Sequence, residues 1–351
     1  MRARCFVVGS LGLAMLLVAA ACTSFGADDA SAAEAGPETS QGDARAAACA
    51  IPTPAPPITT CSDCAATPLF TTEKAQLAIV AGTTIYSVRA GELRANPNIE
   101  TGTFTHLDEG PAINGDPTAM AVDDAYVYVS TTKGHVRVPR AGGVVAPLPL
   151  FHPDPSVARP VLVGTTFFYE LQPERVVRSP KAGDPDAGTE VTVTPTSALA
   201  VDGDVAYWIG TSSASEQVIQ GPFPDLTGHG TVSSKVLGFV VKDQLAYVAE
   251  PSTTGIGSVI SRIDLGDSAR ARLTDEPGKV ESFHVSGHRL YWIALRLPAD
   301  GSRVFASVDL CGGPTTLHAK ELMPLRSTVS FDASYAYAAG AAAEAIYRMK
   351  K

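Results

Sequence analysis

The sequence predicts an all-β fold built from a repeated unit, and three observations carry this prediction. One short pattern occurs seven times, with spacings of 42, 41, 38, 40, 44 and 46 residues between successive copies. Most copies contain four short apolar or β-branched segments separated by turn residues. The last copy lacks its fourth segment, and a matching segment precedes the first copy. Repeats of about 40 residues with four strands each are typical of propeller blades, so we expect a seven-bladed β-propeller with four-stranded blades.

The repeated pattern is clearest at residues 201–208, where a tyrosine directly follows an apolar residue and stands six positions after a large apolar residue. The tyrosines of the copies are Tyr86, Tyr128, Tyr169, Tyr207, Tyr247, Tyr291 and Tyr337. The apolar residues six positions earlier are Val80, Val122, Val163, Val201, Val241, Val285 and Phe331. We expect both to be structural positions, with each tyrosine ring packed between adjacent sheets and its hydroxyl satisfied locally.

Each copy is expected to form one blade in chain order. An apolar triplet such as residues 120–122 makes the first strand, a polar turn such as 123–125 follows, and the second strand carries the tyrosine. Residues 135–139 are a typical third strand and residues 190–194 a typical fourth strand. The first copy has a weak third strand at 91–94, and the fourth copy is irregular, with a loop expected at 210–217 between its second and third strands.

The two chain ends are expected to close the ring. The seventh copy ends directly after its third strand, and residues 67–72 resemble the fourth strands of the other copies. We therefore predict that this N-terminal segment completes the last blade. Such a closure would remove two exposed sheet edges.

A family resemblance supports this architecture. Residues 119–128 and 199–208 resemble the blades of bacterial secreted β-propellers that read Val-Asp-x-x-x-Val-Tyr-Trp, distant relatives of the NHL, YWTD and YncE-like repeat groups. The resemblance covers residues 66–351. The Tyr-Trp pair is kept at 207–208 and 291–292, and the full Tyr-Trp-Thr-Asp sequence at neither. The resemblance implies a propeller fold and no particular ligand.

The N-terminal region predicts export and lipidation. Arg2 and Arg4 precede an apolar run at residues 6–18, which is typical of a secretory signal. The run ends in Val-Ala-Ala-Ala-Cys and resembles the bacterial lipobox, in which the cysteine, here Cys22, becomes the lipidated first residue. Because Thr23 rather than aspartate follows, we expect an outer-membrane lipoprotein, with a secreted protein as the alternative. Residues 1–21 are thus the signal, 22–65 an Ala-, Ser- and Pro-rich tether, and 66–351 the propeller.

The charge of the chain excludes one class of partner. Removal of the signal leaves 25 basic and 36 acidic residues, a net charge of −11. Nucleic-acid binding requires neutralisation of phosphates by Lys and Arg, so we expect no nucleic-acid partner. The expected partners are the membrane, through the lipid on Cys22, and an envelope protein or a glycan, with the propeller itself a monomer.

Four cysteines remain outside the signal and the anchor, and an even number in an exported protein predicts two disulfides. They are Cys49, Cys61, Cys64 and Cys311. The sequence leaves three pairings open, of which we prefer one that joins Cys311 to Cys61 or Cys64 and staples the tether to the sixth copy. A zinc site is not expected, because the Cys-x-x-Cys at 61–64 lacks a second pair of ligands.

Three aspartates recur five positions before the tyrosine, in the turn after the first strand: Asp123, Asp202 and Asp332. They predict turn residues, since aspartate hydrogen-bonds the backbone that follows it. The alternative is a channel rim where these carboxylates, with Asp124 and Asp204, converge on a hard cation such as Ca²⁺. We expect no cofactor, with Ca²⁺ as that alternative.

Two other sets of residues have a regular spacing: a pair of histidines and a series of arginines. His284 and His288 have a spacing that suits a metal only on a helix, and the predicted strand and turn do not provide one, so no metal is expected there. The third strands carry arginines in register, at Arg137, Arg178, Arg262 and Arg348. We expect them to pair with neighbouring acids or to keep the outer strands soluble.

The sequence contains no nucleotide-binding or nucleophile-elbow motif. The function we predict is therefore a membrane-anchored binding or scaffolding lipoprotein outside the cytoplasm. The alternative is a hydrolase, for instance a lactonase, with a cation at the mouth of the propeller channel, a place where propellers commonly carry such sites.

Overall fold

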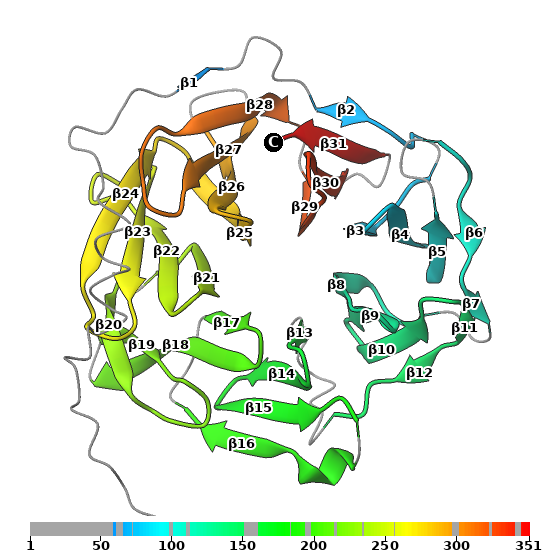
Figure 1. The fold of residues 1–351 in the computed structure, drawn as a ribbon, viewed down its shortest axis with the longest axis horizontal. Helices are drawn as coiled ribbons and strands as arrows, with labels where there is room; N and C mark the ends of the chain where they lie inside the picture. Colours follow the sequence, from blue (N-terminus) through cyan, green and yellow to red (C-terminus); the bar gives the residue numbers. More distant parts are fainter. Residues whose placement is uncertain are drawn as a thin grey trace, which may run out of the picture.

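The computed structural model of the chain is a ring of seven four-stranded sheets around a central axis (Figure 1). The described residues are 59–60, 66–71, 73–97, 101–109, 113–150, 161–182, 184–193, 198–213, 216–233, 235–255, 257–296, 302–322, 325–340 and 345–351. The signal, Cys22, and most of the tether, including Cys49, Cys61 and Cys64, lie outside them. Among the described residues, no helix is long and apolar enough to cross a membrane.

The first four blades follow the chain, each with its strands hydrogen-bonded in sequence order from the axis outward. Blade 1 contains β3 (Leu77–Ala81), β4 (Thr84–Arg89), β5 (Glu92–Asn96) and β6 (Thr105–His106). Blade 2 contains β8 (Pro117–Val122), β9 (Tyr126–Thr131), β10 (Gly134–Pro139) and β12 (Ala146–Pro147). Blade 3 contains β13 (Leu162–Val163), β14 (Phe167–Gln172), β15 (Arg175–Pro180) and β16 (Thr189–Thr192), with a 3₁₀ turn at Pro185–Ala187. Blade 4 contains β17 (Ala198–Asp202), β18 (Val205–Ser213), β19 (Glu216–Gln220) and β20 (Gly228–Val232).

The remaining blades complete the ring. Blade 5 contains β21 (Gly238–Lys242), β22 (Leu245–Pro251), β23 (Ser258–Asp264) and β24 (Arg270–Glu276). Blade 6 contains β25 (Lys279–Ser286), β26 (Arg289–Leu295), β27 (Arg303–Asp309) and β28 (Thr316–Leu322). Blade 7 contains β29 (Leu325–Phe331), β30 (Tyr335–Gly340) and β31 (Ile346–Lys350). A small parallel pair, β7 (Asp108–Glu109) with β11 (Gly143–Val144), connects the outer parts of blades 1 and 2.

The N-terminal strand closes the ring as predicted. β2 (Thr67–Pro68) pairs antiparallel with β31, placing Thr67 opposite Arg348 and Pro68 opposite Tyr347. A second N-terminal strand, β1 (Thr59–Thr60), runs parallel to β28 and adds a fifth strand to blade 6. Figure 1 shows both segments on the outside of the ring, next to the seam between blades 6 and 7.

One cysteine of the predicted staple is described. Cys311 is disulfide-bonded and lies in blade 6, two residues after the end of β27. Since its predicted partners lie outside the described residues, the pairing stays a prediction.

Turn chemistry explains why the first two strands of a blade form a tight hairpin. Asp243 and Gln244 both have positive φ, of 51° and 62°, between paired Lys242 and Leu245. This is the two-residue turn whose twist matches the strands it joins. The loop expected at residues 210–217 is wrong: β18 runs to Ser213 and β19 starts at Glu216, so both strands simply extend further from the turn.

The core is divided into apolar clusters between adjacent sheets. Each of the clusters formed by described residues draws its side chains from two neighbouring blades. Tyr337 of blade 7, for example, packs with Val80 and Ile85 of blade 1 across the closure. A blade therefore buries both faces only when both neighbours are present, which is the physical reason that the ring has to close.

Candidate functional site

Asp123 and Asp332 occupy the same turn position in blades 2 and 7. One carboxylate oxygen of each accepts hydrogen bonds from the backbone amides two and three residues later, at 2.7 to 2.9 Å. The other oxygen accepts the hydroxyl of the repeat tyrosine, Tyr128 or Tyr337, at 2.6 Å. Each aspartate thus fixes its turn and holds its tyrosine at the same time.

Asp202 and Asp204 lie in the corresponding turn of blade 4, and their carboxylates bind the neighbouring blades. Asp202 accepts hydrogen bonds from Lys242 Nζ at 3.1 Å and from the backbone amide of Asp243 at 2.6 Å, both in blade 5. Asp204 accepts from the backbone amide and the hydroxyl of Thr166 in blade 3, at 2.8 and 2.7 Å. These two acids connect blade 4 to both of its neighbours.

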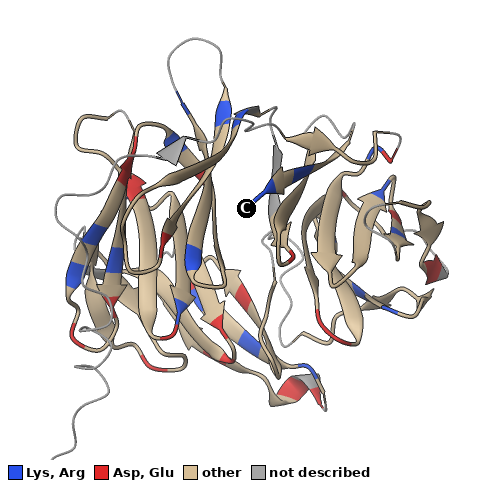
Figure 2. Cartoon of the chain, turned by 45° about the horizontal axis from the view of Figure 1, so that its top comes forward, with Lys and Arg blue, Asp and Glu red and all other residues tan. Residues whose placement is uncertain are grey.

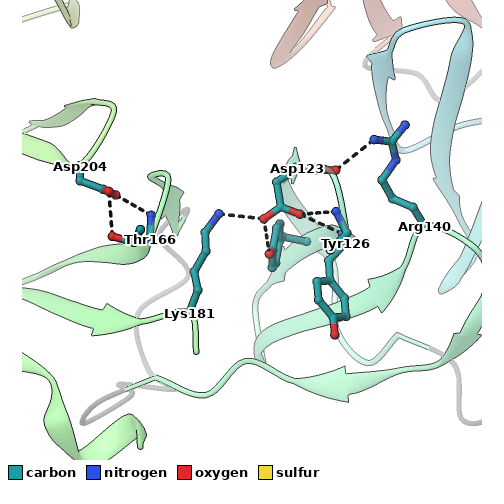
Figure 3. A network of polar contacts seen from close by, with 8 residues as sticks. Asp123, Tyr126, Arg140, Thr166, Lys181 and Asp204 are labelled. Carbon is teal, nitrogen blue, oxygen red and sulfur yellow. Dashed lines mark hydrogen bonds and ion pairs between the residues drawn. The ribbon is translucent and has the colours of Figure 1, made fainter. Parts of the chain in front are cut away.

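Lys181, directly after β15, connects blade 3 to blade 2 (Figure 3). Its ammonium donates to Asp123 Oδ2 at 2.8 Å and lies 5.7 Å from the ring centroids of Tyr128 and Phe168. Burial alone would raise the pKa of Asp123, but the hydrogen bonds from Lys181, Tyr128 and the backbone outweigh it and lower this pKa to about 2. The ion pair therefore persists throughout the neutral range.

The position directly after the third strand carries a cation in blades 2, 3 and 7. Arg140 Nε donates to the Tyr86 hydroxyl of blade 1 at 3.0 Å, and Lys351 Nζ lies 5.7 Å from the ring centroid of Tyr291 of blade 6. Each of these cations covers the repeat tyrosine of the preceding blade. In blade 6 the position is Leu310. Sequence reasoning missed this contact, although a basic residue one position after the predicted third strand could have indicated it.

The repeat tyrosines are buried in every blade, with 0 to 6% of their surface exposed. Beyond the three hydroxyls already described, Tyr169 donates to the backbone carbonyl of Asp204 in the next blade at 2.5 Å. The rings of Tyr128 and Tyr169 pack edge-on against Phe168 and Phe223 of the following blades, at 5.2 and 6.1 Å. These side chains are packing groups at the interfaces between blades.

Three of the four third-strand arginines lie over aromatic rings, a contact that the sequence did not predict. The expectation was that they pair with acids or keep the outer strands soluble. Arg137 lies 4.8 Å from the ring centroid of Tyr126, and Arg178 lies 4.5 Å from that of Phe167. Arg348 stands in the same relation to Tyr335, at 4.5 Å. In each case the ring belongs to the residue two positions before the repeat tyrosine. Such cation–π contacts hold the outer strand onto the hairpin.

The innermost strands of blades 3 to 7 line a cavity of 710 Å³ at the centre of the ring. Its wall is mainly apolar, and the repeat residues six before the tyrosine contribute to it: Val163, Val201, Val241, Val285 and Phe331. Polar groups are few and include Asp202, Lys242 and His284. A concave apolar surface with a few polar groups is the usual form of a ligand site.

A second cavity of 520 Å³ adjoins the first, because Val163 and Val201 line both. Asp123 and Lys181 form part of its wall, next to the exposed Asp124. The turns of blades 2 to 4 therefore surround a continuous hollow at one mouth of the channel. Acidic and basic residues are spread over the blades and do not gather in one patch (Figure 2).

The structure does not bring the predicted cation ligands together. Among the described residues, no three His, Cys, Asp or Glu side chains are grouped so that they could hold a metal ion. His284 Nε2 lies 2.5 Å from the hydroxyl of Ser282, while the exposed His288 lies 4.0 Å from Asp309. The carboxylates of Asp123, Asp202 and Asp332 instead bind turns, tyrosines and neighbouring blades.

No family model matches the chain, and no curated protein matches it. Solved structures do. The chain is similar to virginiamycin B lyase from Staphylococcus aureus, with 12% identity and a TM-score of 0.58 over 82% of this chain and 98% of that chain. It is also similar to hydrazine synthase from Kuenenia stuttgartiensis, with 13% identity and a TM-score of 0.54 over 80% and 96% of the two chains. A third is the Pan2 WD40 domain from Neurospora crassa, with 10% identity and a TM-score of 0.52 over 84% and 98%. At these identities the likeness shows the fold alone, and the chain is a β-propeller.

Proposed function

We propose that the chain is a membrane-anchored binding or scaffolding protein of the cell envelope, which binds its partner at one mouth of the propeller channel. The observation that carries the proposal is the pair of adjoining cavities that share Val163 and Val201. Their apolar walls supply buried area for a ligand, and Lys242, Asp202 and Lys181 at their edges supply polar contacts that fix its orientation.

The rigidity of the ring supports a binding role. The turns that surround the mouth are held by contacts between blades, such as Asp202 with Lys242 and Asp204 with Thr166. A surface that is already ordered loses little conformational entropy on binding. The partner we expect is an envelope protein or a glycan whose apolar face enters the hollow.

Site-specific photo-crosslinking tests where the partner binds. A photoreactive residue replaces Asp124, whose exposed side chain lines the smaller cavity, or Val144, which is 63% exposed on β11. We expect a discrete crosslinked product from position 124 in intact cells and none from position 144. Equal products from both positions, or a product from position 144 alone, would contradict a binding site at the channel mouth.

The anchor is tested separately. The Val-Ala-Ala-Ala-Cys sequence supports lipidation of Cys22. Replacement Cys22→Ser removes the thiol that would carry the lipid, so we expect the protein to move from the membrane fraction to the soluble fraction. Incorporation of labelled fatty acid into the wild-type chain and not into the variant would be the matching observation. An unchanged membrane fraction in the variant would rule out this anchor.

A further inference from the structure

Blades 5 and 6 enclose a third cavity of 350 Å³, which shares Lys242 with the wall of the central cavity. Its apolar wall includes Leu245 and the ring of Tyr247 from blade 5 and Leu310 from blade 6. Arg262 of β23 also lines it, and stands directly opposite Tyr247 on the adjacent strand. The cavity therefore combines an apolar body with a guanidinium group.

Two departures from the repeat explain why there is a hollow here. Blades 2, 3 and 7 have an aromatic residue two positions before the repeat tyrosine, and the third-strand arginine lies over it. In blade 5 that position is Leu245, so Arg262 has no ring to cover. The following blade provides Leu310 where blades 2, 3 and 7 have a lysine or an arginine. Two long side chains that fill this place elsewhere are thus missing.

Arg262 has unused binding capacity. Its Nη1 atom is buried and has no hydrogen-bond partner among the described residues. Four aspartates also line the cavity, and three of them hold their own turns: Oδ1 of Asp264, Asp267 and Asp309 each accepts a hydrogen bond from the backbone amide two residues later. A buried guanidinium nitrogen without a partner is costly, and an incoming anion would satisfy it.

Tyr247 is a second group in the cavity that is suited to donate a hydrogen bond. Burial raises the pKa of Tyr247 to about 12, so its hydroxyl keeps its proton at neutral pH. No hydrogen bond joins this hydroxyl to another described residue, unlike those of Tyr128 and Tyr337, which donate to aspartates.

We propose that the cavity between blades 5 and 6 binds a small organic carboxylate with an apolar or aromatic body. The carboxylate pairs with Arg262 and accepts from Tyr247, and the body packs against Leu245 and Leu310. Planar carboxylates are the preferred partners of guanidinium groups, since both oxygens can be engaged at once.

The test uses phenylacetate as the probe and phenylacetamide as its uncharged counterpart. Binding of each to the purified full-length protein is followed by ligand-observed NMR titration. We expect saturable binding of the acid and at least about tenfold weaker binding of the amide, the factor that a charge-assisted hydrogen bond supplies. Arg262→Met should weaken binding of the acid by a similar factor. Arg137→Met is the matched control, because Arg137 holds the same strand position in blade 2 and lies over Tyr126.

A second variant keeps the guanidinium of Arg262 and fills the cavity beside it. Leu245→Phe introduces the aromatic residue that blade 3 has at this position, so the variant should fold, cover Arg262 and lose phenylacetate binding. Circular dichroism and thermal melting establish the fold of each variant. The proposal is overturned if the wild-type protein does not bind the acid saturably. It is also overturned if acid and amide bind equally, or if Leu245→Phe or Arg262→Met binds as the wild type does.

Discussion

Two neighbouring acids in β24 provide a sharp test of what holds the blades together. Glu276 is 2% exposed and accepts hydrogen bonds from Trp292 Nε1 at 2.9 Å and from Arg296 Nε and Nη2 at 2.8 and 3.0 Å. It also accepts the amide of Gly278 at 2.9 Å. Asp275 pairs with a surface arginine three residues earlier in the chain, and its side chain is 58% exposed. The two acids therefore lie next to each other in one strand, Glu276 buried and Asp275 exposed.

Removal of the buried acid should be costly. In Glu276→Ala the indole N–H of Trp292, in a residue with no exposed surface, loses its acceptor, and such an unsatisfied group costs about 1–3 kcal/mol. The side chain of Arg296 is 26% exposed, so water can hydrate part of it once its partner is removed. Loss of this ion pair should therefore cost less than the 3–5 kcal/mol that is typical when a fully buried ion pair loses one partner. We expect a total loss of about 3 kcal/mol, against about 0–1 kcal/mol for Asp275→Ala.

Urea unfolding followed by circular dichroism measures both variants under oxidising conditions, so that the disulfide at Cys311 stays intact. The free energy of unfolding of Glu276→Ala should fall well below that of Asp275→Ala at an unchanged dependence on urea. Glu276→Gln, which keeps an acceptor for the indole, should fall between the wild type and the alanine variant. A difference below about 1 kcal/mol between the two alanine variants would refute the reasoning that buried acceptors hold blades 5 and 6 together.

Three further perturbations have definite expected outcomes. Burial, with a smaller contribution from Arg289, lowers the pKa of His318 from its ordinary value of about 6.5 to about 4. The folded state therefore favours the neutral imidazole, and stability should fall by about 3 kcal/mol in total as pH falls from about 6.5 to 4. Melting at different pH values checks this, and His318→Gln should flatten that part of the profile. Gly238→Ala places a methyl group 2.6 Å from Phe283 Cβ and should cost about 1–3 kcal/mol, while Gly228→Ala, whose nearest neighbour is at 4.0 Å, should be nearly neutral in the same urea assay. Lys181→Ala removes a half-buried ion pair and should lower the melting temperature slightly, by a similar amount at low and high salt. An effect that disappears at high salt would show that the lysine is only a solvated surface charge.

The architecture was readable from the sequence because it is repeated. A single hairpin pattern is ambiguous, but seven copies in register define the strands and the number of blades. The last copy lacks a fourth strand and an extra strand precedes the first copy, and this predicts the closure that β2 and β31 form. The short strand β1 was not predicted, because two threonines beside prolines have no pattern of their own and pair only where β28 offers an edge. Strand β18 was predicted to end before residue 210 for a similar reason, because the polar composition of its C-terminal end is typical of a loop.

The turn aspartates were only half predictable. Their role in the turn follows from local chemistry, and the backbone amides that Asp123 and Asp332 accept lie two and three residues away. Their bonds to other blades join residues 38 to 58 positions apart, such as Asp204 with Thr166 and Asp123 with Lys181. Such pairs become visible only when the repeat is folded into a ring, because one blade length separates neighbours in space.

The same reasoning indicates where function is to be sought in this protein. A position that is occupied identically in every blade serves packing, as the buried tyrosines do. A position where a blade lacks the side chain that several other blades share leaves space or charge that packing does not use. Leu245 in place of an aromatic residue and Leu310 in place of a cation leave the guanidinium of Arg262 with a buried, unpartnered nitrogen beside a cavity. If the departures were neutral drift, Leu245→Phe would stabilise the protein by restoring a cation–π contact of about 0.5–1 kcal/mol and would change no binding. Loss of carboxylate binding together with that gain in stability would identify the departure as functional, because the wild-type chain then forgoes stability to keep the cavity open.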